Sequence, residues 1–215
     1  MFKEGSIENY KMLNFLDYIL EGCNGFVCGG CFKHIFTKES PKDIDVFFET
    51  KKDFEDAVAS FDRKTPSYNC EDKDEDKFWF CYQNDNVKAY KHMKTGIRVE
   101  LNRKIFGKPE EILKQFDFTI TKFAYFTTCE HDDDNKLVVQ KKVLFHEDFF
   151  EHLYMKRLVV DDMMLYPAST FERMFKYAKY GFFPCKETKA KIIQALHDMP
   201  LSEMKISESM YDGLD

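Results

Sequence analysis

Val27-Cys28-Gly29-Gly30-Cys31 and Asp43-Ile44-Asp45-Val46-Phe47-Phe48 are the two neighbouring segments that say most about how this chain folds. The second segment alternates as a β-strand does, so side chains two residues apart leave by the same face, about 6.6 Å apart along the strand. Asp43 and Asp45 therefore point together, while the apolar residues between them enter the core. Two carboxylates arranged in this way suit Mg²⁺, which prefers hard oxygen ligands together with substrate phosphates.

The glycine pair next to these metal ligands is suited to binding phosphate. Without Cβ atoms, Gly29 and Gly30 let the backbone approach a ligand closely. A helix beginning near Cys31 would present free N–H groups and the positive end of its dipole to a triphosphate. This region is therefore predicted to form a strand at 25–28, a helix at 32–36 and a loop at 37–42 that leads into the acidic strand.

The rest of the pattern predicts an α+β fold, with a mixed central sheet flanked by helices and a helical segment at the C-terminus. Further helices are expected at 6–20 and 53–61 and from Pro109 onward. Further strands are expected at 78–82, 87–92 and 97–101, with another hairpin around 130–135. The pattern turns helical from Glu147, so we expect one domain over residues 1–146 and a helical region over residues 147–215.

The strand at 97–101 offers a third acid. Its alternation turns Val99 and Leu101 inward and places Arg98 and Glu100 together on the opposite face. Glu100 is a candidate metal ligand from a neighbouring strand, with Arg98 beside it to neutralise phosphate. The alternative is a plain surface ion pair between the two side chains.

Composition limits the possible functions. The chain has 215 residues, 44% of them hydrophobic, which is enough for a packed core. A net charge of −6 argues against a broad basic nucleic-acid footprint, so any RNA contact would be local. The N-terminus lacks a signal-peptide core, and no run approaches the roughly 18 apolar residues of a membrane span. We therefore expect a cytoplasmic protein with no membrane partner, whose seven cysteines are reduced. Nothing in the sequence indicates an oligomeric state.

The diglycine, a spacer of 12 residues and the D-hydrophobic-D-hydrophobic strand together resemble the signature of the DNA polymerase β-type nucleotidyltransferase superfamily. Three later segments are similar, in the same order, to segments of bacterial-type tRNA CCA-adding enzymes and poly(A) polymerases. They are Val99-Glu100-Leu101, Asp117-Phe118-Thr119-Ile120 and the run from Arg173 to Phe182. The resemblance covers most of residues 25–183 and is strongest over 27–48.

The departures from that pattern affect nucleotide contacts. Cys31 stands where the superfamily usually has Ser or Thr, and a thiol is a poor donor to phosphate. Gln115 and Phe116 replace two arginines, and Thr121 replaces an asparagine, so family contacts at these positions are not carried over. Asp117 could orient the nucleotide sugar, brace the site, or only accept hydrogen bonds from backbone amides. Whether the third metal ligand is Glu100 or Asp117 stays open.

The resemblance implies a magnesium-dependent enzyme that moves a nucleoside monophosphate from an NTP, ATP or CTP above all, to an acceptor hydroxyl with release of pyrophosphate. It implies two Mg²⁺ ions, replaceable by Mn²⁺, held by Asp43, Asp45 and Glu100. It implies a nucleotide site formed by Gly29, Gly30, Cys31, Arg98, Asp117 and Arg173. The expected acceptor is RNA, in particular the 3′ end of tRNA. The chain length suits a compact viral member acting in the host cytoplasm.

Other functions stay open. Some toxin-type relatives modify a protein hydroxyl, and a catalytically silent member would only bind nucleotide or RNA, since fold does not fix function. Cys28-x-x-Cys31 could indicate zinc or redox chemistry, but no second ligand pair stands at a matching spacing. A hydrolase based on Ser or Cys is also conceivable, although the chain has no nucleophile-elbow pattern.

Overall fold

The computed structural model describes residues 1–65, 77–131, 137–161 and 164–200. The strands are β1 (Phe2–Ser6), β2 (Gly25–Cys28), β3 (Asp43–Phe48), β4 (Phe78–Gln83), β5 (Val87–His92), β6 (Arg98–Phe106), β7 (Phe123–His131), β8 (Leu137–His146), β9 (Arg157–Leu158) and β10 (Phe183–Pro184). The helices are α1 (Leu16–Leu20), α2 (Cys31–Phe36), α3 (Lys51–Arg63), α4 (Pro109–Lys114), α5 (Phe149–Tyr154), α6 (Pro167–Lys179) and α7 (Lys186–Asp198), with 3-10 helices η1 (Ile7–Leu13) and η2 (Thr119–Thr121).

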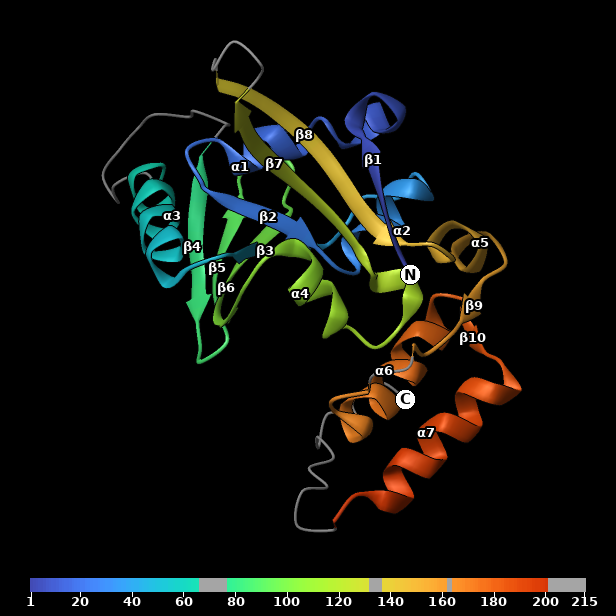
Figure 1. Ribbon diagram of the computed structural model, residues 1–215. Helices are drawn as coiled ribbons and strands as arrows, with labels where there is room; N and C mark the ends of the chain where they lie inside the picture. The colour runs from blue at the N-terminus through green and yellow to red at the C-terminus, as the bar shows by residue number, and fades with distance from the viewer. Residues whose placement is uncertain (66–76, 132–136, 162–163, 201–215) are drawn as a thin grey trace.

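Within the described residues, eight strands form one sheet in the order β1-β8-β7-β2-β3-β6-β5-β4. The sheet is mixed because β3 and β6 run parallel, while β2 is antiparallel to both of its neighbours. Figure 1 shows helices packed around this sheet, and α6 with α7 beyond one end of it. The predicted α+β fold, with a mixed central sheet flanked by helices, is confirmed. The predicted division near His146, where β8 ends, stays a prediction.

The two faces of the sheet are covered unequally. Val27 and Val46 belong to the larger core, which also contains residues of α1, α2 and α3. Phe47 belongs to a smaller core that includes residues of α4. Asp43 and Asp45 share the face of Phe47, because alternate residues of a strand lie on one face. The acidic end of β3 therefore lies on the side of the sheet where α4 packs.

The N-terminal segment differs from its prediction. One helix was expected over 6–20, but the chain forms strand β1, then η1, then α1. Ser6 does cap η1, since its side chain accepts a hydrogen bond from the amide of Glu8 at 3.4 Å. Inside η1 the backbone is kinked at Tyr10, which has a non-helical φ of −131° and ψ of 42°. β1 exists because it pairs with β8, for example Phe2 with His146, which is a partner the local pattern does not reveal.

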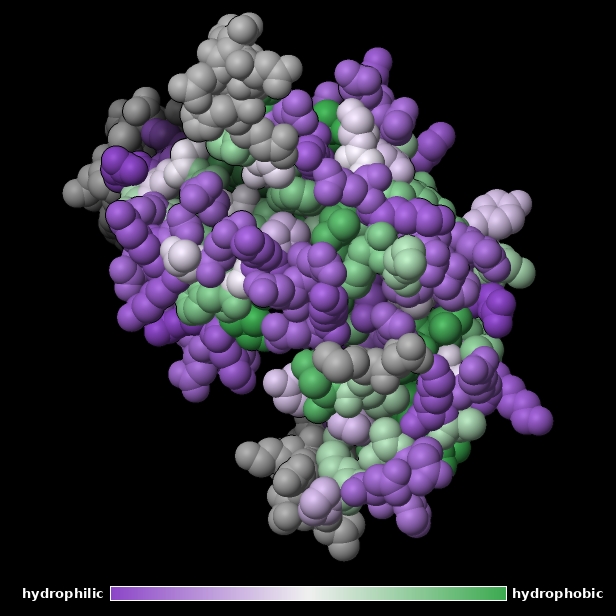
Figure 2. Space-filling model, viewed as in Figure 1, coloured by the Kyte–Doolittle hydropathy of each residue, from purple (hydrophilic) through white to green (hydrophobic). Residues whose placement is uncertain are grey.

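The surface in Figure 2 is mostly hydrophilic over the sheet, while apolar side chains gather where α6 and α7 lie. Phe175 of α6 and Ile193 of α7 are 44% and 64% exposed. None of the helices in the described ranges has the length and apolar character needed to cross a membrane.

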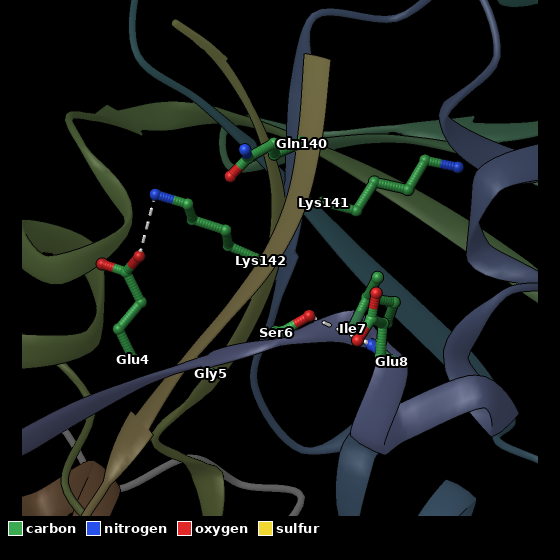
Figure 3. A pocket seen from close by; sticks show the side chains of 8 residues that line it. All are labelled: Glu4, Gly5, Ser6, Ile7, Glu8, Gln140, Lys141 and Lys142. Atoms are coloured by element: carbon green, nitrogen blue, oxygen red, sulfur yellow. Dashed lines mark hydrogen bonds and ion pairs between the residues drawn. The ribbon is translucent and has the colours of Figure 1, made fainter. Parts of the chain in front are cut away.

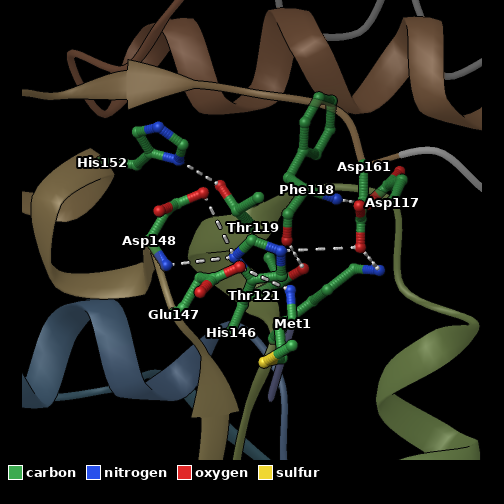
Figure 4. Close-up of polar contacts among 11 residues, drawn as sticks. Met1, Asp117, Phe118, Thr119, Thr121, His146, Glu147, Asp148, His152 and Asp161 are labelled. Atoms are coloured by element: carbon green, nitrogen blue, oxygen red, sulfur yellow. Dashed lines mark hydrogen bonds and ion pairs between the residues drawn. The ribbon is translucent and has the colours of Figure 1, made fainter. Parts of the chain in front are cut away.

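A buried polar network joins the start of β7 to the segment that precedes α6 (Figure 4). The side chain of Lys122 is only 1% exposed, and its Nζ donates to Oδ2 of Asp161 at 2.7 Å. Nε2 of His146 lies 3.8 Å from the same carboxylate oxygen. The amide of Asp161 donates to the carbonyl of Asp117 at 3.1 Å. The network therefore ties both Asp117 and Lys122 to Asp161.

Candidate active site

A cavity of about 360 Å³ opens at the acidic end of β3. The described residues that line it are Gly30, Cys31, Lys33, His34, Lys42, Asp43, Asp45, Glu100, Phe116, Asp117, Thr121, Arg173, Lys176, Tyr177 and Tyr180. The structure thus brings together seven predicted site residues, namely Gly30, Cys31, Asp43, Asp45, Glu100, Asp117 and Arg173. Gly29 and Arg98 lie next to these residues in the chain or the sheet but do not line the cavity.

Strand register places the acids. Asp45 pairs with Glu100 across the parallel strands β3 and β6, and Asp43 pairs with Arg98. On its other side Asp45 pairs with Cys28, the residue before the diglycine turn. Burial, and then the charges of Glu100 and Asp43, raise the pKa of Asp45 to about 7. The acids are therefore close enough to repel one another.

Arg98 relieves part of that repulsion. Its Nη2 lies 3.1 Å from Oδ2 of Asp43, and its Nε lies 2.7 Å from Oε1 of Glu100. The hydroxyl of Tyr82 also donates to Oε1 of Glu100, at 2.7 Å. With the side chains in this arrangement, no three Asp, Glu, His or Cys residues of the described chain are grouped to hold one metal ion. The Arg98–Glu100 pair predicted as an alternative is thus present, at the edge of the cavity.

The donor set nevertheless fits a hard divalent cation. The three carboxylates come from adjacent strands and offer oxygen ligands only, as Mg²⁺ and Mn²⁺ prefer. A bound cation would relieve the repulsion that Asp43 and Glu100 impose on Asp45. Asp43, Asp45 and Glu100 are therefore the residues that would hold a metal, in competition with Arg98 for two of them.

Replacing Arg98 by methionine is expected to tighten Mn²⁺ binding about fivefold, because a competing positive charge is removed from beside the carboxylates. The affinity can be measured by electron paramagnetic resonance of free Mn²⁺, without any turnover. Arg103→Met is the matched control, since Arg103 is an exposed residue of the same strand that donates to the carbonyl of Asn84. Weaker binding in Arg98→Met than in this control would contradict the competition.

The two glycines are needed for different reasons. Gly29 has φ +104°, a backbone conformation that favours glycine. A Cβ there would lie 3.6 Å from Oδ2 of Asp45, so the turn passes close to the acid. Gly30 has an ordinary φ of −69°, but a Cβ would lie 3.2 Å from the hydroxyl of Tyr177. Gly30 therefore makes room for α6, a role that its sequence context did not indicate.

Positive charge reaches the cavity from two helices. Lys33 of α2 is 6% exposed, and its Nζ lies 4.6 Å from the ring centroid of Tyr180. Burial, and then the charge of Lys176, lower the pKa of Lys33 to about 8. Sequence reasoning missed Lys33, although its place three residues after Gly30 was a usable signal. Lys176 lies on α6 with Arg173, as their spacing of three residues suggested.

Asp117 is already engaged by two partners. Its Oδ1 accepts a hydrogen bond from the amide of Phe118 at 2.9 Å, and its Oδ2 lies 2.9 Å from Nη2 of Arg173. The carboxylate is 4% exposed and ties η2 to α6. This arrangement gives Asp117 the part of positioning Arg173 at the cavity.

The cysteines of Cys28-x-x-Cys31 are both buried and free. Burial raises the pKa of each thiol well above its usual range. Metal binding and disulfide exchange require the thiolate, which this environment disfavours. The geometry therefore supports the glycine turn, rather than the cysteines, as the functional part of this segment.

A larger hollow of about 490 Å³ lies beside the edge strand β1, but it contains none of the predicted site residues. Figure 3 shows Glu4 and Lys142 facing each other there, 3.1 Å apart, and Ser6 bonded to the amide of Glu8. Its lining has two glutamates and two lysines, so it lacks the converging acids of the β3 cavity.

A sequence profile described as "Gabija anti-defense 2 family protein" matches residues 6–156, which is more than half of the chain. The chain belongs to the Gabija anti-defense 2 family. The matched residues include Asp43, Asp45, Glu100 and Asp117, and they end before α6, which carries Arg173. The matched range thus covers the cavity residues outside α6, the glycine turn and Lys33 included. A search of curated proteins found no match to the chain.

Solved structures similar to this Gabija anti-defense 2 family chain share its nucleotidyltransferase fold. A Thermotoga maritima CCA-adding enzyme complexed with tRNA has a TM-score of 0.53 and 16% identity, over 91% of this chain and 46% of that one. A CCA-adding enzyme with CTP has a TM-score of 0.55 and 14% identity, over 94% and 48%. A tRNA nucleotidyltransferase with a primer tRNA and an ATP analogue has a TM-score of 0.50 and 13% identity, over 89% and 53%. The chain spans about half the length of these proteins.

Proposed function

We propose that this chain is a divalent-metal-dependent nucleotidyltransferase, which transfers a nucleoside monophosphate from an NTP to an acceptor hydroxyl. One observation carries the proposal. Asp43, Asp45 and Glu100 line the same cavity as Gly30 of the diglycine turn and the cations of α2 and α6. Acids that would hold a metal and cations that would bind a triphosphate thus line one cavity.

The transfer forms a bond between the acceptor oxygen and the α-phosphorus. It breaks the bond from that phosphorus to the bridging oxygen, so that pyrophosphate leaves and the acceptor proton passes to solvent. Lys33, Arg173 and Lys176 would bind the negative charge of the triphosphate. Asp43, Asp45 and Glu100 would hold Mg²⁺ or Mn²⁺. Bound ions would activate the acceptor hydroxyl and stabilise the leaving pyrophosphate.

The acceptor we favour is RNA, including the 3′ end of tRNA. Two observations support it. Similar folds have been solved with tRNA, CTP and an ATP analogue. The lysines and arginine around the cavity also provide local positive charge in a chain whose net charge is −6.

A second candidate is transfer to a protein hydroxyl. The family description names an anti-defense role directed at Gabija, and modification of a protein of that defence would serve such a role. The chemistry at the metal and the triphosphate would be the same, because only the acceptor differs.

Incubation of purified protein and Mn²⁺ with each α-labelled NTP, alone or with total tRNA, tests the proposal. Label on RNA is expected. A parallel incubation contains a protein extract in place of tRNA. Label on a protein of that extract, with none on RNA, would establish the second candidate. No transfer to either acceptor with Mg²⁺ or Mn²⁺ would overturn the proposal and leave a binding module.

A further inference from the structure

A second hollow, of about 270 Å³, opens beside the candidate active site. It lies between the end of α2, the turn after α5 and the end of α6. It shares Lys33, His34 and Tyr180 with the acid-lined cavity, so the two hollows meet at these side chains. Lys156 and Lys179 complete its basic wall. We call the surface formed by Lys33, Lys156 and Lys179 the lysine groove.

The lysine groove is positively charged in a protein that is acidic overall. Glu39 is the sole carboxylate among the described residues that line it. Oε2 of Glu39 lies 2.8 Å from Nδ1 of His34, so this acid already has a partner within the groove. The hydrogen bond from His34, followed by charges that include Lys156 and Lys33, lowers the pKa of Glu39. Local excess of positive charge next to a phosphate-transfer site indicates a further anion-binding surface.

Lys156 lies in the groove with a strained backbone conformation. Its φ is +54°, in the left-handed region that glycine normally occupies after a helix. A lysine there is strained, and the surrounding structure must sustain that conformation. The amide of Phe183 donates to the carbonyl of Lys156 at 3.0 Å and fixes the turn. Nζ of Lys156 lies 4.5 Å from the ring centroid of Phe182, so the charge is directed along the groove wall.

Two aromatic rings line the groove beside these lysines. Tyr180 lies under Nζ of Lys33 where the two hollows meet. Phe182 lies under Nζ of Lys156 on the same wall. Basic side chains interleaved with aromatic rings are typical of surfaces that bind single-stranded nucleic acids. An acidic peptide would use the charges but not the rings.

We propose that the lysine groove binds the phosphodiester backbone of a single-stranded nucleic acid, whose terminal hydroxyl enters the acid-lined cavity. The inference rests on the proposed function for the role of that hydroxyl. Because the two hollows share Lys33 and Tyr180, a strand lying in the groove ends at the metal-binding acids. Lys156 and Lys179 then contact phosphates upstream of the reacting end.

The test uses the full chain and three fluorescein-labelled probes of one short sequence. The probes are a single-stranded RNA, a single-stranded DNA and a duplex. Binding is followed by fluorescence anisotropy at several salt concentrations. Lys156→Glu/Lys179→Glu is expected to weaken binding by at least about tenfold and to reduce the slope of log affinity against log salt by about 1.4, the loss of two phosphate contacts to a single strand. Lys51→Glu/Lys52→Glu on α3 makes the same change in net charge and is expected to alter binding less than about twofold.

Binding and transfer are scored separately, so the two proposals can fail independently. Affinity of the groove variant for single strands within twofold of wild type would overturn the inference, whether or not RNA is labelled. Groove-dependent binding without transfer would uphold the inference and count against the proposed function. A fluorescent ATP analogue that binds the groove variant normally would show that the neighbouring cavity is intact. The inference would also be overturned if the wild-type protein bound the duplex as tightly as the single strand. It would be overturned as well if label were transferred to protein and no nucleic acid were bound.

Discussion

Asp45→Asn is expected to lower nucleotidyl transfer at least about a thousandfold, because metal and electrostatic stabilisation supply most of the rate of such a reaction. Asp45 lies between Cys28 and Glu100 in the sheet, at the centre of the acidic wall. Asparagine preserves the shape of the side chain but removes the charge that would hold a divalent ion. Labelled transfer to RNA and Mn²⁺ affinity should therefore fall together.

The same variant should fold normally. Asp45 forms no ion pair with Arg98, whereas Asp43 and Glu100 do. Removing its charge relieves the repulsion with Asp43 and Glu100 and breaks no ion pair. The unfolding midpoint should therefore stay at or above that of wild type. Asp56→Asn on the exposed face of α3 is the control for a general effect of lost charge. Wild-type turnover by Asp45→Asn would remove the acids from the proposed chemistry.

Asp161→Asn is expected to lower the free energy of unfolding by about 2–4 kcal/mol, since it leaves the buried ammonium of Lys122 without its carboxylate partner. The side chain of Lys122 is 1% exposed and that of Asp161 is 29% exposed, so the value should fall toward the lower end of this range. Urea unfolding followed by circular dichroism measures the change. Transfer should fall as well, because a loosened segment around residue 161 would weaken the hydrogen bond from its backbone amide, which the substitution keeps, to the carbonyl of Asp117.

Two further variants separate charge from packing. Lys122→Met/Asp161→Leu removes both partners and should recover most of the lost stability, as apolar replacement of a buried pair commonly does. Glu147→Gln disrupts an exposed contact with the N-terminal amine and should leave stability nearly unchanged. If Asp161→Asn unfolds at the same urea concentration as wild type, the pair does not stabilise the junction between β7 and the segment before α6.

Local elements near the acids could be predicted from the sequence because their determinants are local. The alternation of Asp43-Ile44-Asp45-Val46 is sufficient to indicate a strand whose acids share a face. The diglycine indicates a tight turn, and Gly29 indeed has a positive φ. Strand 87–92 and the inward orientation of Val99 and Leu101 followed from the same periodicity and are confirmed.

Longer-range features were not accessible in this way. β1 depends on pairing with β8, which is more than 130 residues away in the chain, and its sequence has no clear alternation. The break at Tyr10 likewise interrupts a pattern that reads as one helix. Both are outcomes of packing between distant segments, which outweighs local propensity.

The chain's residue pattern was enough to identify the acids, the glycine turn and the superfamily that they resemble, because strand periodicity and the backbone freedom of glycine act within a few residues. The fold alone established that Arg98 also binds Asp43, that Gly30 makes room for Tyr177, and that Lys33 is buried beside the acids. These features depend on which strands become neighbours and where α6 packs. Such contacts join residues far apart in the chain, so charge, burial and pKa at the site are properties of the assembled structure.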